Sequence, residues 1–172
     1  MRSIGTTVGA ALMAAGMLLG CDTAFVAHAT PEEVVLNGTY RATSDGGWAK
    51  LNHQMHDMET VTSIWTISTT CTSSKACTGQ VSTDAGWSAP IELNWGQWLV
   101  NYDVQSWQRC SDGSTFPGHR HYKFRQINRN DIYSKVDVGD LEGYEETLGP
   151  SGACGNNQWM LVEMPFTLVK IG

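Results

Sequence analysis

Apolar and polar side chains alternate with a period of two along much of this chain, and this alternation limits the fold more than any other feature. In residues 61–70, Trp65 and Ile67 share one face, and Ile64 and Thr66 share the other. Successive side chains of a β-strand point to opposite faces, and β-branched and aromatic residues favour strands. We therefore predict strands at 61–70, 79–83, 89–94, 97–104, 119–127 and 160–171.

Residues that favour turns separate these runs. Gly and Asp occur at 84–86 and 111–113, as short loops between strands require. Short strands with turns between them predict an all-β domain, either an antiparallel sandwich or an open meander barrel with two disulfides. Residues 48–60 depart from this pattern, and we expect a helix or a long loop there. Pro165 in the last run predicts an edge strand or a bulge.

The N-terminus predicts export. Arg2 provides a positive charge, residues 4–20 contain no charged side chain, and Asp22 follows. This is the arrangement of a secretory signal peptide, whereas a membrane-spanning helix needs about 20 apolar residues. We predict a signal peptide at 1–29, a tether at 30–37 and a single β-domain at 38–172.

Two processing sites remain open. Residues 18–21, Leu-Leu-Gly-Cys, resemble a bacterial lipobox, in which residues 1–20 would be a lipoprotein signal and Cys21 would be lipidated. Residues 27–29, Ala-His-Ala, have the form that ordinary signal peptidase recognises. In both cases the protein is exported, secreted or held at the cell envelope. We expect membrane contact only through a lipid anchor on Cys21.

The cysteine count fits an oxidising compartment. Of five cysteines, either cleavage takes Cys21 out of the thiol pool and leaves an even number, as is typical of exported chains. Cys71 and Cys77 lie on either side of a turn, Cys110 ends a strand, and Cys154 precedes the last strand. We therefore predict disulfides Cys71–Cys77 and Cys110–Cys154.

The charge argues against a nucleic-acid partner. The formal net charge is -6, and removal of residues 1–29 leaves it unchanged, because Arg2 and Asp22 are both lost. Binding to phosphates needs a basic face. We therefore expect no nucleic acid among the partners.

The order of Gly, Trp and Cys resembles that of a known group of proteins. Gly-Thr-Tyr at 38–40 and Trp-Thr-Ile at 65–67 precede Cys-Thr-Gly at 77–79, Trp107 and Gly-Ala-Cys-Gly at 152–155. This spacing, over roughly residues 38–171, resembles small exported proteins and lipoproteins of mycobacteria. It is more loosely similar to the extracellular sensor-like domains of mycobacterial receptor Ser/Thr kinases. The resemblance implies an extracytoplasmic β-domain with two disulfides and without an established enzyme activity.

Few residues indicate catalysis or metal binding. His53 and His56 form one pair and His119 and His121 another, and they would suit zinc or copper only if the pairs met. Their spacing matches no zinc signature, so we predict no metal and no cofactor. We interpret the acidic residues of 137–146 as a solvated turn and not as a calcium loop. No set of residues predicts a catalytic triad.

The seven tryptophans give the strongest indication of binding. An exposed Trp often marks a ligand or partner surface, because it offers a large apolar face and one hydrogen-bond donor. We predict ligand-binding residues at Trp87, Trp95, Trp98, Tyr102 and Phe124.

The preferred function is therefore an exported, non-catalytic binding or interaction domain of the bacterial cell envelope. Its partner would be an envelope glycan, a lipid or a protein. The first alternative is a carrier that holds a lipid or small molecule in the lumen of a β-barrel, and the last is an envelope hydrolase. A cavity lined by Trp98, Tyr102 and Phe124 would favour the carrier. A filled interior with tryptophans on the outside would favour the binding domain.

Overall fold

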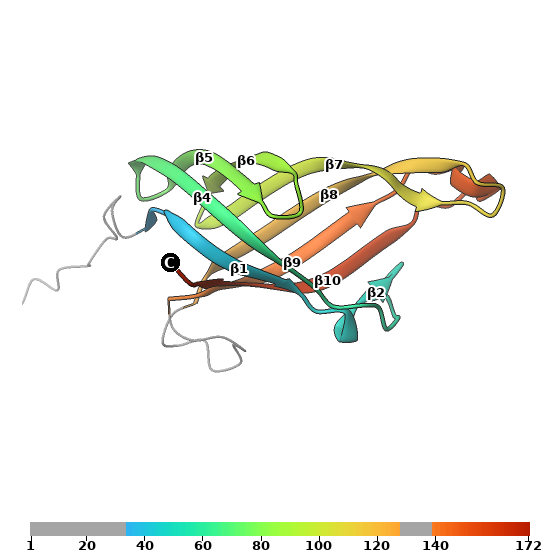
Figure 1. The fold of residues 1–172 in the computed structure, drawn as a ribbon, viewed down its shortest axis with the longest axis horizontal. Helices are drawn as coiled ribbons and strands as arrows, with labels where there is room; N and C mark the ends of the chain where they lie inside the picture. Colours follow the sequence, from blue (N-terminus) through green and yellow to red (C-terminus); the bar gives the residue numbers. More distant parts are fainter. Residues whose placement is uncertain (1–33, 128–138) are drawn as a thin grey trace, which may run out of the picture.

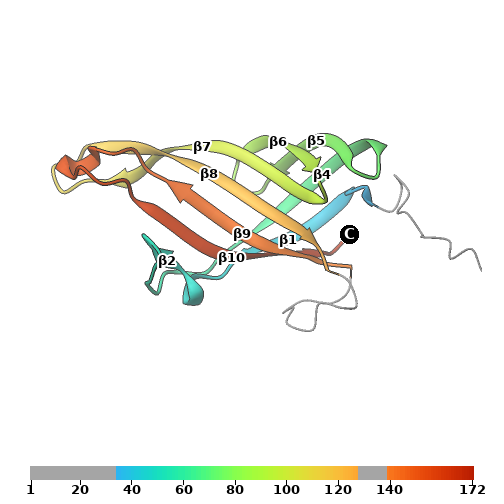
Figure 2. The ribbon, with the colours of Figure 1, turned by 180° about the vertical axis from the view of Figure 1, so that it is seen from behind.

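Eight antiparallel strands form a closed barrel in the computed structural model, which describes residues 34–127 and 139–172 (Figures 1 and 2). Each strand pairs with the next along the chain, and β1 pairs with both β4 and β10. The all-β prediction is confirmed, and the architecture is the barrel and not the sandwich. The barrel is closed because β1 lies between the first and last long strands, which leaves no long edge exposed. The strands are β1 (Gly38–Ser44), β4 (Val61–Ser73), β5 (Ala76–Thr83), β6 (Ser88–Asn94), β7 (Gln97–Arg109), β8 (Thr115–Gln126), β9 (Leu141–Leu148) and β10 (Leu161–Lys170).

The predicted signal peptide, both processing sites and the first residues of the tether lie outside the described residues. Among the residues that are described, no helix is long and apolar enough to cross a membrane. The described end of the tether contacts the barrel. Leu36 is buried, its N–H donates to Thr69 Oγ1, and the Thr69 hydroxyl donates to the Leu36 carbonyl.

Residues 48–60 form neither a helix nor a long loop, contrary to expectation. The chain makes a short 3-10 turn, η1 (Gly46–Trp48), and then a small hairpin of β2 (Lys50–Leu51) and β3 (Gln54–Met55). Asn52 and His53 both have positive φ, 48° and 66°, as the favoured two-residue hairpin turns require. β2 pairs with β10, so the hairpin extends the wall of the barrel beyond the end of β1 (Figure 1).

Pro165 lies in the middle of the sheet and not at an edge. On one side it pairs with Tyr144 of β9. On the other side it falls between the part of β10 that pairs with β1 and the part that pairs with β2. Its carbonyl accepts a hydrogen bond from the Asp45 N–H at 2.9 Å. The nitrogen of Pro165 lies on the same side, at the gap between β1 and β2. No strand is paired with β10 at this point, so the N–H that proline lacks is not needed for a hydrogen bond between strands.

Aromatic side chains fill the interior of the barrel. Trp65 on β4 is 1% exposed, and its ring lies 4.9 Å from that of Tyr122 and 5.2 Å from that of Phe166 between centroids. On β4 the face shared by Trp65 and Ile67 points inward, and on β7 Trp98 and Val100 point inward in the same alternation. The period-two alternation of the sequence therefore places the apolar side chains of these strands in the core.

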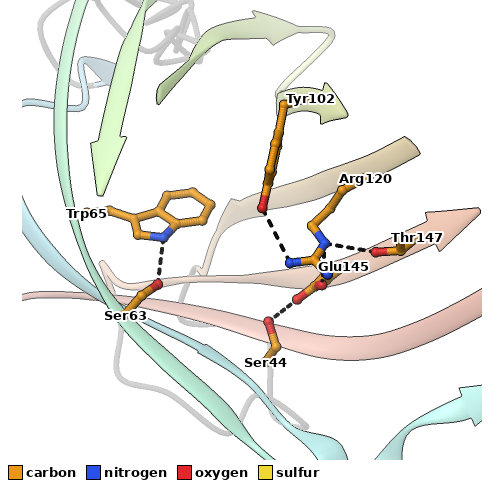
Figure 3. A network of polar contacts seen from close by, with 7 residues as sticks. All are labelled: Ser44, Ser63, Trp65, Tyr102, Arg120, Glu145 and Thr147. Atoms are coloured by element: carbon orange, nitrogen blue, oxygen red, sulfur yellow. Dashed lines mark hydrogen bonds and ion pairs between the residues drawn. The ribbon is translucent and has the colours of Figure 1, made fainter. Parts of the chain in front are cut away.

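A buried polar network lies beside these aromatic rings (Figure 3). Arg120 on β8 forms an ion pair with Glu145 on β9, with 3.0 Å between Nε and Oε1. The Arg120 Nε–H also donates to Thr147 Oγ1, and Nη1 donates to the Tyr102 hydroxyl. The Ser44 hydroxyl donates to the second oxygen of Glu145, so the network connects β1, β7, β8 and β9. Every oxygen of the buried carboxylate thus has a partner, as burial demands.

The acidic residues near the end of the chain do not form the solvated turn that we expected. Residues 142–146 lie within β9, with Glu142 and Glu146 on the outer side and Glu145 inside. The part of this run before residue 139 lies outside the described residues. Leu141 and Thr147, both buried, set the inward face of the strand and carry Glu145 inward with them.

Both predicted disulfides are confirmed. Cys71 and Cys77 face each other across the β4–β5 hairpin, and their bond closes its end. Cys110 follows β7 and bonds to Cys154 in η2 (Ala153–Gly155), the short turn before β10. The second bond therefore ties the end of the β7–β8 hairpin to the loop that leads into the last strand.

Candidate functional site

Exposed aromatic and apolar side chains gather on one outer side of the barrel, around the β2–β3 hairpin. Two hollows open there, one of about 560 Å³ and one of about 500 Å³. Both volumes fall in the range of roughly 300–1,000 Å³ that ligand sites occupy. We call the two hollows and the residues that line them the hairpin face.

The first hollow lies beside the hairpin, where β2 continues the barrel wall. Its floor is the outer face of β8, β9 and β10, and Trp48 and Met55 stand at its side. Lys50 lies opposite Met55 in the hairpin and opposite Glu163 in β10, so the three side chains form one row. Trp48 is 57% exposed and Tyr144 on the floor is 59% exposed.

The second hollow lies at the tip of the hairpin. Trp159, which is 65% exposed, lies between Gln158 and the start of β10, and Leu148 at the end of β9 lines the same hollow. The hairpin turn is fixed here, because Asn52 Oδ1 accepts from the Leu161 N–H at 2.9 Å and the Asn52 N–H donates to the Leu161 carbonyl at 2.8 Å. The loop and the hairpin are therefore held in register with each other.

An ion pair lies between the hollows. His53 Nδ1 of the hairpin turn is 2.7 Å from Glu163 Oε2 on β10. His53 lines the second hollow and Glu163 the first. The two hollows are therefore neighbours on one continuous surface, with an exposed Trp beside each.

The ligand-binding residues predicted from the sequence do not form this face. Trp98 and Phe124 are 3% and 1% exposed and belong to the core. Trp87 stacks on Tyr102 with 4.2 Å between ring centroids, so each ring covers a face of the other. Trp95 is 86% exposed, in the turn between β6 and β7.

Burial governs the titration of the interior tyrosines. Desolvation raises the pKa of Tyr102 and raises that of Tyr122 further. Desolvation opposes the charge of Arg120, but the neighbouring Glu145 carboxylate and the tyrosines raise the pKa of the guanidinium above its usual value. The network therefore consists of one charged pair, Arg120 and Glu145, among neutral tyrosine hydroxyls. We interpret its role as structural.

The histidines at 53, 56, 119 and 121 are spread over the outer surface. His119 Nδ1 is 2.9 Å from Asp103 Oδ1, His121 bonds to the Asn101 side chain, and His53 pairs with Glu163. Within 34–127 and 139–172, no group of three or more His, Cys, Asp or Glu residues is placed to hold a metal ion.

Sequence reasoning missed Trp48, Met55, Tyr144 and Trp159. The local signal for the hairpin was the pair Asn52-His53, because Asn and His are enriched among residues with positive φ. The signal at the second hollow was the amide-rich stretch of residues 156–158 before Trp159.

The fold and this face define a class of protein: a closed eight-stranded antiparallel barrel with two disulfides and an exposed aromatic face. Among solved structures, the chain is similar to the monomer form of the M. tuberculosis PknI sensor domain, with a TM-score of 0.56 and 17% identity over 81% of this chain and 89% of that chain. This likeness shows a shared fold and supports the loose similarity to kinase sensor domains. No protein-family model and no curated protein matches the chain. The two disulfides are consistent with an exported protein, because such bonds persist in oxidising compartments.

Proposed function

We propose that this protein is an exported, non-catalytic binding domain of the bacterial cell envelope, and that its ligand lies on the hairpin face. The observation that carries the proposal is the exposure of Trp48 and Trp159 beside two neighbouring hollows. Large apolar rings that remain in water do not gain the free energy of burial. A ligand that covers these rings removes them from water and gains that free energy. Trp, Tyr and Met are also the residue types enriched at binding surfaces.

The packed interior favours this function over that of a carrier. A carrier needs an apolar lumen with room for its ligand. Here Trp98 and Phe124 pack within one hydrophobic core, and Trp87 and Tyr102 cover each other. The hollows lie on the outside of the wall.

We propose further that the domain acts outside the cytoplasm, either secreted or held by a lipid on Cys21. The disulfides support this proposal because such bonds persist in oxidising compartments. Intact-mass measurement of the protein from its native host tests it. A mass starting at Thr30, or one starting at a diacylated Cys21, is expected, and a mass that includes residues 1–20 would contradict it.

Retention on isolated cell envelope tests the binding function. Purified protein with both disulfides formed is mixed with sedimented envelope of the producing bacterium, and the bound fraction is measured across protein concentrations. Trp48→Ala and Trp159→Ala should each weaken retention by about tenfold, because removal of a central aromatic residue typically costs more than 1 kcal/mol of binding free energy.

Trp95→Ala is the matched control. Trp95 is more exposed than either of the other two, at 86%, and lies in the β6–β7 turn away from the hairpin. Its removal should leave retention unchanged. Equal retention of all three variants would show that the hairpin face is not the site, and no retention of the unaltered protein would contradict an envelope-binding function.

A further inference from the structure

We infer that the ligand of the hairpin face is a neutral glycan chain that lies across both hollows, from Trp48 to Trp159. This inference rests on the proposed function, because it names the ligand class of the same site. It follows from three properties of the face: its charge, its backbone pairing and its side-chain chemistry.

The charge of the face favours an uncharged ligand. Lys50 and Arg125 in the lining are balanced by Glu142 and Glu163. Arg125 and Glu142 lie opposite each other on β8 and β9, and Glu163 is paired with His53. This local balance contrasts with the net charge of -6 on the whole chain. A strongly anionic or cationic partner would instead select a face of opposite sign.

The backbone of the face argues against an extended peptide. β9 is paired with β8 and with β10, and β10 is paired with β9 and with β2. Peptides that add a strand to a sheet need a free edge with open N–H and C=O groups. The floor of the face offers no such edge, and the free edge of β3 beside it is only two residues long, Gln54–Met55. Recognition there therefore depends mainly on side chains.

The side chains suit sugar rings. A pyranose ring has an apolar face of C–H groups and an edge of hydroxyls. Trp48, Tyr144 and Trp159 offer flat apolar faces. Next to Trp159, Gln158 carries an amide that both donates and accepts, and Asn52 Nδ2 remains a donor, since its Oδ1 is used by Leu161. Such groups match hydroxyls, which also donate and accept.

The spacing of the hollows indicates a chain and not a single sugar. Each hollow has its own exposed Trp, and the His53–Glu163 pair lies between them. A ligand that reaches both tryptophans gains from two linked contacts, whereas a monosaccharide reaches one. Affinity should therefore rise steeply with chain length.

Selective destruction of envelope components tests the ligand class. Envelope is treated with periodate, which cleaves vicinal diols of sugars, with protease, or with chloroform–methanol, which extracts lipid. Retention of the unaltered protein should be lost after periodate and kept after the other two treatments. Loss after protease or after lipid extraction, with retention after periodate, would overturn the glycan inference and leave the proposed binding function standing.

A titration with defined sugars gives a second readout. Tryptophan fluorescence is followed as maltohexaose, mannohexaose, cellohexaose, the corresponding monosaccharides and anionic hexagalacturonate are added. At least one neutral hexasaccharide should bind at least about tenfold more tightly than its monosaccharide and than hexagalacturonate. Trp48→Phe, which keeps a flat ring, should retain part of the affinity that Trp48→Ala loses. Tighter binding of hexagalacturonate, or equal binding of hexamer and monomer, would overturn the inference.

Discussion

At the scale of residues, the Arg120–Glu145 pair is the most consequential contact inside the barrel. Their side chains are 21% and 8% exposed, and the pair has hydrogen-bonding partners on β1, β7 and β9. Arg120→Met would leave the Glu145 carboxylate buried without its countercharge. Loss of one partner from a buried pair typically costs about 3–5 kcal/mol. Urea unfolding followed by fluorescence should show a loss of this size in the free energy of unfolding.

The double variant Arg120→Met with Glu145→Leu provides the control. Replacement of both charges by apolar side chains of similar volume is often close to neutral. The double variant should therefore recover most of the stability that Arg120→Met loses. If it is as unstable as the single variant, the pair does not act as a unit and the loss comes from packing around Arg120 instead.

At the scale of elements, the two disulfides should contribute unequally. The cysteines are 6 residues apart in the β4–β5 bond and 44 apart in the bond to η2. Closure of a longer loop removes more entropy from the unfolded chain, about 4 kcal/mol for the second bond against about 2 kcal/mol for the first. Cys110→Ser with Cys154→Ser should therefore lower the free energy of unfolding more than Cys71→Ser with Cys77→Ser. Equal losses in urea unfolding would contradict this ranking.

The elements that the sequence predicted are those with strong alternation. The inward rows of β4, β7 and β10 consist mainly of apolar side chains, and β8 contributes Tyr122 and Phe124 next to the inward Arg120. β9 was missed because Gly143 and Glu145 lie on its inward face, where the pattern calls for apolar residues. Glu145 is tolerated there only because Arg120 on the neighbouring strand pairs with it. That partner is set by tertiary structure and not by local sequence.

At the scale of the whole molecule, the hairpin face depends on contacts between distant parts of the chain. Trp48 and Trp159 lie on one side because β2 pairs with β10, a register that no local pattern specifies. The sequence shows how many tryptophans the chain has, but which of them are exposed to solvent depends on how the barrel closes. The prediction from the sequence therefore gave the class of fold and the disulfides and missed the residues of the face.

The central claim is that ligand binds at the hairpin face, and the indole N–H signals of the seven tryptophans test it in one spectrum. Solubilised cell-envelope material is added to ¹⁵N-labelled protein, and each indole signal is followed after assignment by single Trp→Phe variants. The signals of Trp48 and Trp159 should shift or broaden while those of Trp65 and Trp98 stay in place. Changes confined to Trp87 and Trp95 would contradict the account.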